Sequence, residues 1–278
     1  MIIKKYLITI IIFTSCQSNN ISDPEIARLI IQAESAFRGG YYNAALSIAD
    51  SAISLNPKLA DIHFLKGRVL TKLSRFAEAE DAYFQVISID NKYQGAWFNI
   101  GTNNLRQNKV PQAIYNYFNE MNEHPSAQTM VQIGKAYSDL GKADSAHLLY
   151  EKAIQINPEF ADAHYELALI LKDKKDYKES KKHFLKTIEI RPEFPAAHFN
   201  YALLLNEVKD HKTSKEHFHK AIDLDQDFAE AHYHFGLLLI ELEDYEEAKN
   251  HFEKATDIDQ NYTLAYFNLA RLLIDPED

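Results

Sequence analysis

The sequence has one cysteine among its 278 residues, so no disulfide can form within the chain. Its 8 glycines and 8 prolines are too few for the many tight turns of an all-β fold. No apolar run reaches the roughly 20 residues that a helix needs to cross a bilayer. The chain also lacks the G-x-S-x-G, H-E-x-x-H, P-loop and G-x-G-x-x-G motifs of common enzyme classes, so we expect no catalytic residues and no cofactor.

The charge balance narrows the range of partners. The formal net charge is −10 at pH 7, and a surface of this sign is repelled by phosphate backbones. We therefore expect no nucleic acid partner. The acidity suits either a basic partner or an ordinary solvated surface that keeps the protein soluble, and the second interpretation is the simpler one.

The chain is rich in internal repetition. Small residues recur at steps of 34 residues, with a single step of 33, at Ala33, Gly67, Gly101, Gly134, Ala168, Ala202, Gly236 and Ala270. A second small series follows twelve residues behind, at Ala45, Ala79, Ala113, Ala146, Ser180, Ser214 and Ala248. Four residues later comes a mostly aromatic series, at Ala49, Tyr83, Tyr117, Tyr150, Phe184, Phe218 and Phe252. A fixed period with small and large residues in fixed positions indicates a repeat array.

The apolar spacing within each repeat predicts two helices. Leu167, Ala168 and Leu171 share one helix face with His164, and Phe184 marks a second helix after a polar break. The small residues allow the two helices to approach closely, and we expect the aromatic residue of the second helix to fill the space against the next repeat. Because neither helix can bury its apolar stripe alone, stability must come from stacked neighbours.

These residues resemble the tetratricopeptide repeat, whose pattern is W-x2-L-G-x2-Y, then A-x3-F, then P. One repeat matches closely, with Ile133, Gly134, Tyr137, Ala146, Tyr150, Ala153 and Pro158. The resemblance implies an all-α fold, an α-solenoid that winds as a right-handed superhelix of about seven helix pairs plus a capping helix. The expected repeats lie near 26–59, 60–93, 94–126, 127–160, 161–194, 195–228 and 229–262, with the capping helix at 263–275.

The third repeat departs from the pattern. Asn103 and Asn104 replace apolar residues, and Glu120 replaces the usual alanine. The departure indicates either a bend or lateral partner site at this repeat, or ordinary drift in a tolerant array, which is the simpler interpretation.

The N-terminus has the order of a secretory signal, because Lys4 and Lys5 precede a short apolar run at 6–13. Phe13-Thr14-Ser15-Cys16 then resembles the lipobox of bacterial lipoproteins. In that class the signal is cleaved before the cysteine, which is acylated and anchors the protein in a membrane. An ordinary signal peptide with an incidental cysteine and an uncleaved anchor are the alternatives.

The lipobox resemblance implies a signal peptide at 1–15, a lipidated Cys16 with a polar linker over 16–22, and a repeat body at 23–278. The expected location is the bacterial cell envelope. Gln17 follows the cysteine where an aspartate would favour the inner membrane, so we expect an outer membrane lipoprotein with its body in the periplasm.

In the tetratricopeptide family the first helix of each pair lines an inner groove, and the position after the tryptophan position points into it. The resemblance therefore implies a partner-binding groove formed by Phe64, Arg68, Phe98, Lys135, Tyr165, Leu169, Phe199, Leu203, Tyr233 and Leu237. We expect the most apolar patch at Leu169, Phe199, Leu203, Tyr233 and Leu237. The alternative is that the aromatic residues pack partly against the neighbouring helix.

The 12 histidines raise the question of a metal site. Seven of them recur in two repeat positions, at His63, His164, His198 and His232 and at His183, His217 and His251. Metal ligands must converge around one ion, whereas these lie at intervals along the array. We interpret them as packing residues and expect no metal.

Together these features predict a non-catalytic, lipid-anchored scaffold that binds another protein through a peptide or helix in the groove. The alternative is an envelope subunit that binds a glycan or another small ligand in the same groove.

Overall fold

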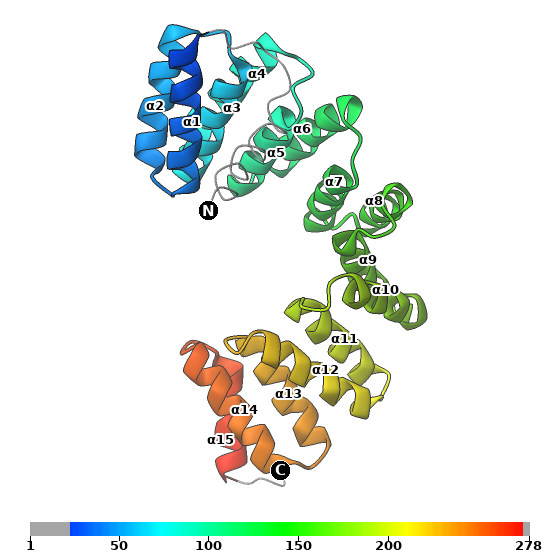
Figure 1. The fold of residues 1–278 in the computed structure, drawn as a ribbon. Helices are drawn as coiled ribbons and strands as arrows, with labels where there is room; N and C mark the ends of the chain where they lie inside the picture. The colour runs from blue at the N-terminus through cyan, green and yellow to red at the C-terminus, as the bar shows by residue number, and fades with distance from the viewer. Residues whose placement is uncertain (1–22, 275–278) are drawn as a thin grey trace, which may run out of the picture. The chain divides into compact units, whose positions relative to one another are not determined.

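The computed structural model describes residues 23–274, and the predicted signal peptide, Cys16 and the polar linker lie outside this part of the chain. The described residues form fifteen helices and no strand (Figure 1), which confirms the predicted all-α fold. The helices are α1 Pro24–Arg38, α2 Tyr42–Leu55, α3 Ala60–Lys72, α4 Phe76–Ile89, α5 Ala96–Arg106, α6 Val110–Glu123, α7 Ala127–Asp139, α8 Ala143–Ile156, α9 Ala161–Asp173, α10 Tyr177–Ile190, α11 Pro195–Glu207, α12 His211–Leu224, α13 Ala229–Glu241, α14 Tyr245–Ile258 and α15 Thr263–Ile274. Within residues 23–274, no helix has the length and apolar character needed to cross a membrane.

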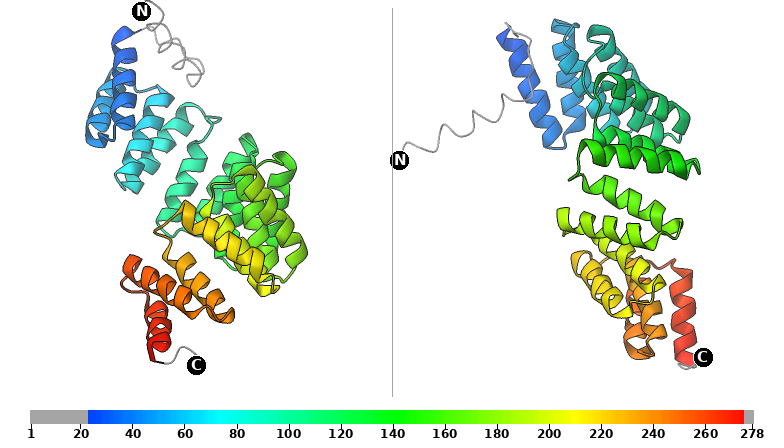
Figure 2. Two further views of the ribbon diagram at one scale, coloured as in Figure 1. Left: turned by 60° about the horizontal axis from the view of Figure 1, so that its bottom comes forward. Right: turned by 90° about the vertical axis from the view of Figure 1, so that its right-hand side faces the viewer.

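The helices belong to two compact units, which meet in the sequence between His124 and Pro125. Unit 1 contains the pairs α1/α2, α3/α4 and α5/α6, and each pair packs on the next. Unit 2 contains the pairs from α7/α8 to α13/α14, followed by α15 beside α14 (Figure 2). The division falls at the one place where the repeat step is 33 rather than 34 residues.

The small positions hold the two helices of a pair in close contact. A Cβ atom added to Gly67 of α3 would lie 2.6 Å from the Tyr83 ring of α4. A Cβ atom on Gly236 of α13 would lie 2.7 Å from the Phe252 ring of α14. The aromatic residue of the second helix therefore lies directly on the small residue of the first helix in its own repeat. It also reaches the next repeat, as the sequence pattern predicts, because the Phe218 ring centroid lies 5.6 Å from that of Phe235.

The turn inside each pair requires one residue in the left-handed backbone region. Glycine supplies it at Gly40 and Gly141, with φ of 78° and 72°. Residues with side chains take the same place in the other five turns, namely Ser74, Asn108, Lys175, Lys209 and Glu243, with φ between 57° and 63°. These five turns carry backbone strain that glycine would relieve.

The polar residues of the third repeat form a buried network. Asn116 Nδ2 donates to Asn104 Oδ1 at 2.7 Å, and Asn104 Nδ2 donates to Glu80. Asn103 Nδ2 donates to Thr71 Oγ1 at 3.0 Å. Each amide therefore has a partner, which explains how these residues replace apolar ones without leaving a buried polar group unsatisfied.

Glu120 acts on the start of the neighbouring helix. Its side chain is 3% exposed, and its two carboxylate oxygens accept from the backbone N–H groups of Gly95 at 2.8 Å and Phe98 at 3.3 Å. A carboxylate at a helix N-terminus satisfies free N–H groups and opposes the positive end of the helix dipole. Glu120 therefore has a structural role in unit 1 at a position where the family pattern has alanine.

Candidate partner-binding surface

The predicted groove residues fall into two groups because the chain forms two units. Unit 1 carries Phe64, Arg68 and Phe98, and unit 2 carries the other seven residues. Each group lies on the first helices of its own unit, so each is a candidate surface by itself.

Two aromatic residues of the predicted patch lie inside unit 2 rather than at its surface. Only 4% of Phe199 and 8% of Tyr233 is exposed. The Phe199 ring centroid lies 5.0 Å from that of Phe228, and the Tyr233 centroid lies 4.9 Å from that of Tyr262. Phe199 and Tyr233 therefore support the surface from below, and the expectation that they present an apolar patch to a partner needs this correction.

The residue that covers each buried ring comes from the loop between repeats. Tyr165 is covered in the same way by Phe194, at a centroid distance of 4.9 Å, and Phe64 by Tyr93, at 5.0 Å. The predictions did not include this loop aromatic. Its 34-residue recurrence at Phe194, Phe228 and Tyr262 is visible in the sequence and could have indicated that the groove rings are covered.

Three leucines provide the accessible apolar surface of unit 2. Leu169, Leu203 and Leu237 occupy the same position on α9, α11 and α13, and each is half-buried. Leu203 and Leu237 pack on the core cluster that contains Phe199 and Tyr233. Leu169 packs on the adjoining cluster around α9 and α10. The three leucines thus recur at one repeat position, and each packs on a cluster that contains buried aromatic residues.

The cationic members of the predicted site have partners within their units. Lys135 Nζ lies 2.9 Å from a carboxylate oxygen of Glu166. The Arg68 guanidinium lies 4.4 Å from the centroid of the Phe37 ring and 3.8 Å from a carboxylate oxygen of Glu34. Because their charges are already paired, these two residues add little positive potential to either surface.

The charge of Glu230 shifts the pKa values of several side chains in unit 2. Burial raises the pKa of Tyr165 to about 12, and the charges of Glu166 and Glu230 add to this shift. Burial likewise raises the pKa of Tyr262 to about 12, again with a contribution from Glu230. Burial lowers the pKa of His234, and the charge of Glu230 partly raises it again. The exposed Glu230 carboxylate therefore acts on side chains of α9, of α13 and of the loop before α15.

Six of the recurrent histidines form pairs that the sequence did not predict. The Nδ1 atoms are 2.8 Å apart in His164–His183, 2.9 Å apart in His198–His217 and 2.9 Å apart in His232–His251. Each pair joins the first and second helix of one repeat in unit 2. The signal was present, because a spacing of 19 residues between histidines occurs in three successive repeats.

Hydrogen bonding fixes the protonation of these pairs. His164 Nε2 lies 3.0 Å from the carbonyl oxygen of Pro158, and His198 Nε2 lies 3.0 Å from that of Pro192. A carbonyl only accepts, so Nε2 of each of these two rings carries a proton. Burial and the neighbouring imidazole lower the pKa of the second histidine of the pair, which is about 4 for His183. This lowered pKa keeps the second histidine neutral at pH 7.

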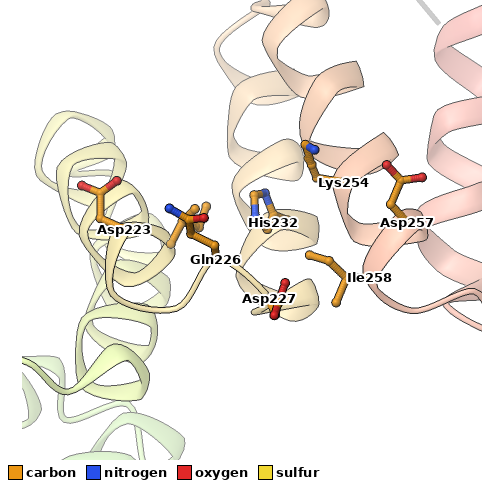
Figure 3. A pocket seen from close by; sticks show the side chains of 8 residues that line it. Asp223, Gln226, Asp227, His232, Lys254, Asp257 and Ile258 are labelled. Atoms are coloured by element: carbon orange, nitrogen blue, oxygen red, sulfur yellow. The ribbon is translucent and has the colours of Figure 1, made fainter.

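Groups arranged to bind a metal are not found among residues 23–274, where no cluster of three or more histidine, cysteine or acidic side chains converges. A shallow depression in unit 2 is lined by Ile222, Asp223, Gln226, Asp227, His232, Lys254, Asp257 and Ile258 (Figure 3). None of these lining residues belongs to the predicted groove, so this depression is separate from the leucine series.

Three protein-family models match the chain, and all three describe the same kind of repeat. A model described as tetratricopeptide repeat matches residues 161–194, 195–228 and 229–262, and a second one of that description matches residues 32–93. A model described as TPR repeat matches residues 134–175. Together they cover more than half of the 278 residues. No curated protein matches the sequence significantly.

Solved structures share the fold at low sequence identity. The structure of the APC/C hetero-tetramer Cut9–Hcn1 has a TM-score of 0.72 at 16% identity, over 88% of this chain and 48% of that chain. This chain thus spans about half the length of that protein. A tetratricopeptide repeat protein from Parabacteroides merdae has a TM-score of 0.67 at 18% identity, over 89% of this chain and 98% of its own. YrrB, described as a TPR protein with an unusual peptide-binding site, has a TM-score of 0.52 at 17% identity, over 66% of this chain and 95% of its own.

Proposed function

Because this chain belongs to the tetratricopeptide repeat family, whose members generally mediate protein–protein interactions, we propose that it is a non-catalytic adaptor anchored in the bacterial envelope. Its partner is a protein segment that binds along the first helices of unit 2. The observation that carries this proposal is the leucine series Leu169, Leu203 and Leu237 on a buried aromatic base.

The arrangement favours a peptide or helix over a glycan. Sugars bind to exposed faces of aromatic rings, but Phe199 and Tyr233 are almost fully buried, and each has a loop aromatic against its ring. Half-buried leucines at a regular spacing instead suit apolar side chains that recur along a segment. The rigid base also lowers the entropy that the surface loses on binding.

The charge of the surface indicates the kind of segment. Glu230 is exposed on α13, the helix that carries Leu237, and Lys135 is already paired with Glu166. A segment that combines apolar residues with a lysine or arginine would match both features, and its charge would also speed the encounter with a chain of net charge −10.

The anchoring part of the proposal rests on the sequence. Phe13-Thr14-Ser15-Cys16 resembles a lipobox, and Cys16 is the only thiol available for acylation. Lipidation at Cys16 would hold the repeat body beside the membrane, and Gln17 favours the outer membrane with the body in the periplasm.

Site-specific photocrosslinking in the native cell tests the adaptor function. The crosslinker replaces Leu203 on the proposed surface, and Lys182 on α10, whose side chain is 71% exposed, serves as the control position. We expect one discrete protein adduct from position 203 only, and a weaker adduct when Glu230→Lys is added. Identical adducts from both positions, or none from position 203, would contradict a binding surface on the first helices.

Mass spectrometry of the protein extracted from membranes tests the anchor separately. Acylation of Cys16 after cleavage gives a mature chain that begins at residue 16 and carries fatty acids. Cys16→Ser should remain uncleaved and unacylated. A mature chain without added lipid would leave the adaptor function in place and remove the anchor.

A further inference from the structure

Two imidazole rings converge at three places in unit 2. Their Nδ1 atoms lie 2.8 to 2.9 Å apart in the pairs His164–His183, His198–His217 and His232–His251. A cluster of three or more ligating side chains is not found among residues 23–274. Two imidazoles nevertheless suffice to chelate a transition-metal ion when water fills its other positions. Each pair is therefore a candidate two-histidine site.

A backbone hydrogen bond holds the first histidine of each pair in the form that binds a metal. Nε2 of His164 and Nε2 of His198 each donate to a proline carbonyl oxygen at 3.0 Å, and His232 bonds to the backbone of Gln226. A neutral ring with its proton on Nε2 has its lone pair on Nδ1, the atom that faces the second histidine. Metal-ligating histidines commonly donate their other N–H to a backbone carbonyl in this way, which fixes the orientation of the ring.

The second histidine of each pair is also available as a ligand. Burial lowers the pKa of His183, His217 and His251 to about 4, so these rings are neutral at pH 7. A neutral ring that carries its single proton on Nε2 presents a lone pair at Nδ1. Two such lone pairs then face one ion, which takes the place of the hydrogen bond between the two Nδ1 atoms.

The separation of the two nitrogens indicates which metal fits. Two nitrogen ligands that lie about 2.0 Å from an ion are about 2.8 Å apart at the 90° angle of a square-planar ion, and about 3.3 Å apart at the tetrahedral angle. The separation in all three pairs matches the square-planar arrangement, which copper(II) prefers. Copper(II) also binds nitrogen ligands most tightly among the divalent first-row metals.

We propose that each of the three histidine pairs binds one copper(II) ion through its two Nδ1 atoms, with water in the remaining positions. Each ion would join the first and second helix of one repeat. The histidines are separate from the leucine series on the first helices, so this proposal is independent of the adaptor function.

The charges around the pairs rank their affinities. The depression beside His232 has three carboxylates and one lysine in its lining, namely Asp223, Asp227, Asp257 and Lys254 (Figure 3). The depression beside His164 and His183 has four lysines and two glutamates, namely Lys178, Lys181, Lys182, Lys186, Glu159 and Glu189. Because carboxylates attract a cation and lysines repel it, His232–His251 should bind copper(II) several-fold more tightly than His164–His183.

Calorimetric titration of the untagged whole chain with copper(II) tests the sites. The chain carries Cys16→Ser because a thiol also binds copper, and free glycine is present to suppress binding to single histidines. We expect three ions per chain. His183→Leu, His217→Leu and His251→Leu should each remove one ion, and the fold tolerates the change because the repeat at 127–160 carries Leu149 at this position.

An unpaired histidine provides the matched control. His63 occupies the same first-helix position in the repeat at 60–93, and its Nε2 lies 2.9 Å from the Pro57 carbonyl oxygen, but Ala82 stands at the matching second-helix position. His63→Met, the residue found at Met130, should leave the count at three ions. An equal loss in His63→Met, or three ions in the triple leucine variant, would overturn the proposal.

Two measurements on the chain with all its histidines keep the proposal testable even where a variant fails to fold. Electron paramagnetic resonance of bound copper(II) should show hyperfine coupling to two imidazole nitrogens per ion. Hydrogen exchange should slow in peptides from α9 to α14 and stay unchanged in unit 1, because an ion that binds only the folded state stabilises the helices it joins. Coupling to a single imidazole, slower exchange in unit 1, or zinc binding as tight as copper(II) binding would overturn the assignment.

Discussion

The two units use different polar side chains at the same position of the second helix. In unit 1, the second-helix position of the third repeat is Asn116, which donates to Asn104 of the first helix. In unit 2, the same second-helix position is His183, His217 or His251, each paired with a histidine of the first helix. The two amides do not titrate, whereas protonation of an imidazole pair places a charge on a partly buried ring, because burial lowers the pKa of the second histidine to about 4. The same fold therefore gives two units with different responses to pH.

Acidification should destabilise unit 2 selectively, and this is the largest expected effect. Burial lowers the pKa of His183, His217 and His251 to about 4 from an ordinary value of 6.5. Because the folded-state pKa is depressed, this contribution to stability is complete above pH 6.5 and is lost as the pH falls toward 4. After a reduction for solvent screening of these partly exposed rings, we expect a loss of about 1–2 kcal/mol per pair.

Urea denaturation between pH 7 and 5, combined with hydrogen exchange of peptides from each unit, measures this difference. Ordinary carboxylates, with pKa values near 4, stay mostly ionised in this range, so they contribute little to the change. Lys182 beside His183 and Lys181 beside His217 oppose a second positive charge and increase the expected loss. An equal loss of protection in unit 1 would contradict the assignment of the effect to the histidine pairs.

Glu120→Ala should destabilise unit 1 at neutral pH, although alanine is the usual residue of the family pattern at this position. The substitution leaves the N–H groups of Gly95 and Phe98 without their acceptor, at a cost of about 2–3 kcal/mol. Urea denaturation at pH 7 gives the value. Glu120→Gln keeps one acceptor oxygen and should lose less. An increase in stability would show that the alanine of the family pattern is better here.

Replacing one histidine pair should reduce the pH response of unit 2 by about a third. Repeat 4 carries Met130 and Leu149 at the two positions that hold His198 and His217, so the chain itself provides an apolar pair that fits. His198→Met with His217→Leu should remove about 1–2 kcal/mol of the loss between pH 7 and 4. Denaturation curves at several pH values test this, and an unchanged pH slope would exclude the pair as its source.

Introducing a histidine pair into repeat 4 is the reverse of the preceding substitution and tests the same pH dependence. Met130→His with Leu149→His should create a fourth pair and increase the pH slope. The two double variants change the same positions in opposite directions, so a shared change in slope would point to altered packing rather than to histidine titration.

The sequence predicted the helix pairs because their determinants are local and periodic. The ring on the small residue, as in Tyr83 on Gly67, needs only the two series of positions along the chain. The start of α1 is local as well, because the Asp23 side chain accepts from the N–H of Glu25 and Pro24 is the first helical residue. The exposure of Phe199 could not be predicted in the same way, because it depends on Phe228 in a loop of the following repeat.

The histidine pairs show a second limit of prediction from sequence. Their positions were recognised as packing positions, but the contact between His164 and His183 depends on the angle at which two helices meet. Likewise, ordinary sequence drift was the simpler interpretation of Asn104 and Glu120, but the structure shows that the side chain of each has a hydrogen-bond partner. The sequence therefore shows which polar residues depart from the repeat pattern, whereas only the structure shows which groups they bond to.

Substitutions in the turns inside the helix pairs should have the smallest effect on stability. They compare the backbone strain of the two units. Lys209 has φ of 63° at the place where Gly40 and Gly141 have 78° and 72°. A residue with a Cβ atom is strained in this region, so Lys209→Gly should stabilise unit 2 by about 0.5–1 kcal/mol. Gly40→Ala in unit 1 is the opposite change and should destabilise it by a similar amount. Urea denaturation at pH 7 measures both, and a loss of stability in Lys209→Gly would mean that the flexibility of glycine in the unfolded chain outweighs the relief of strain.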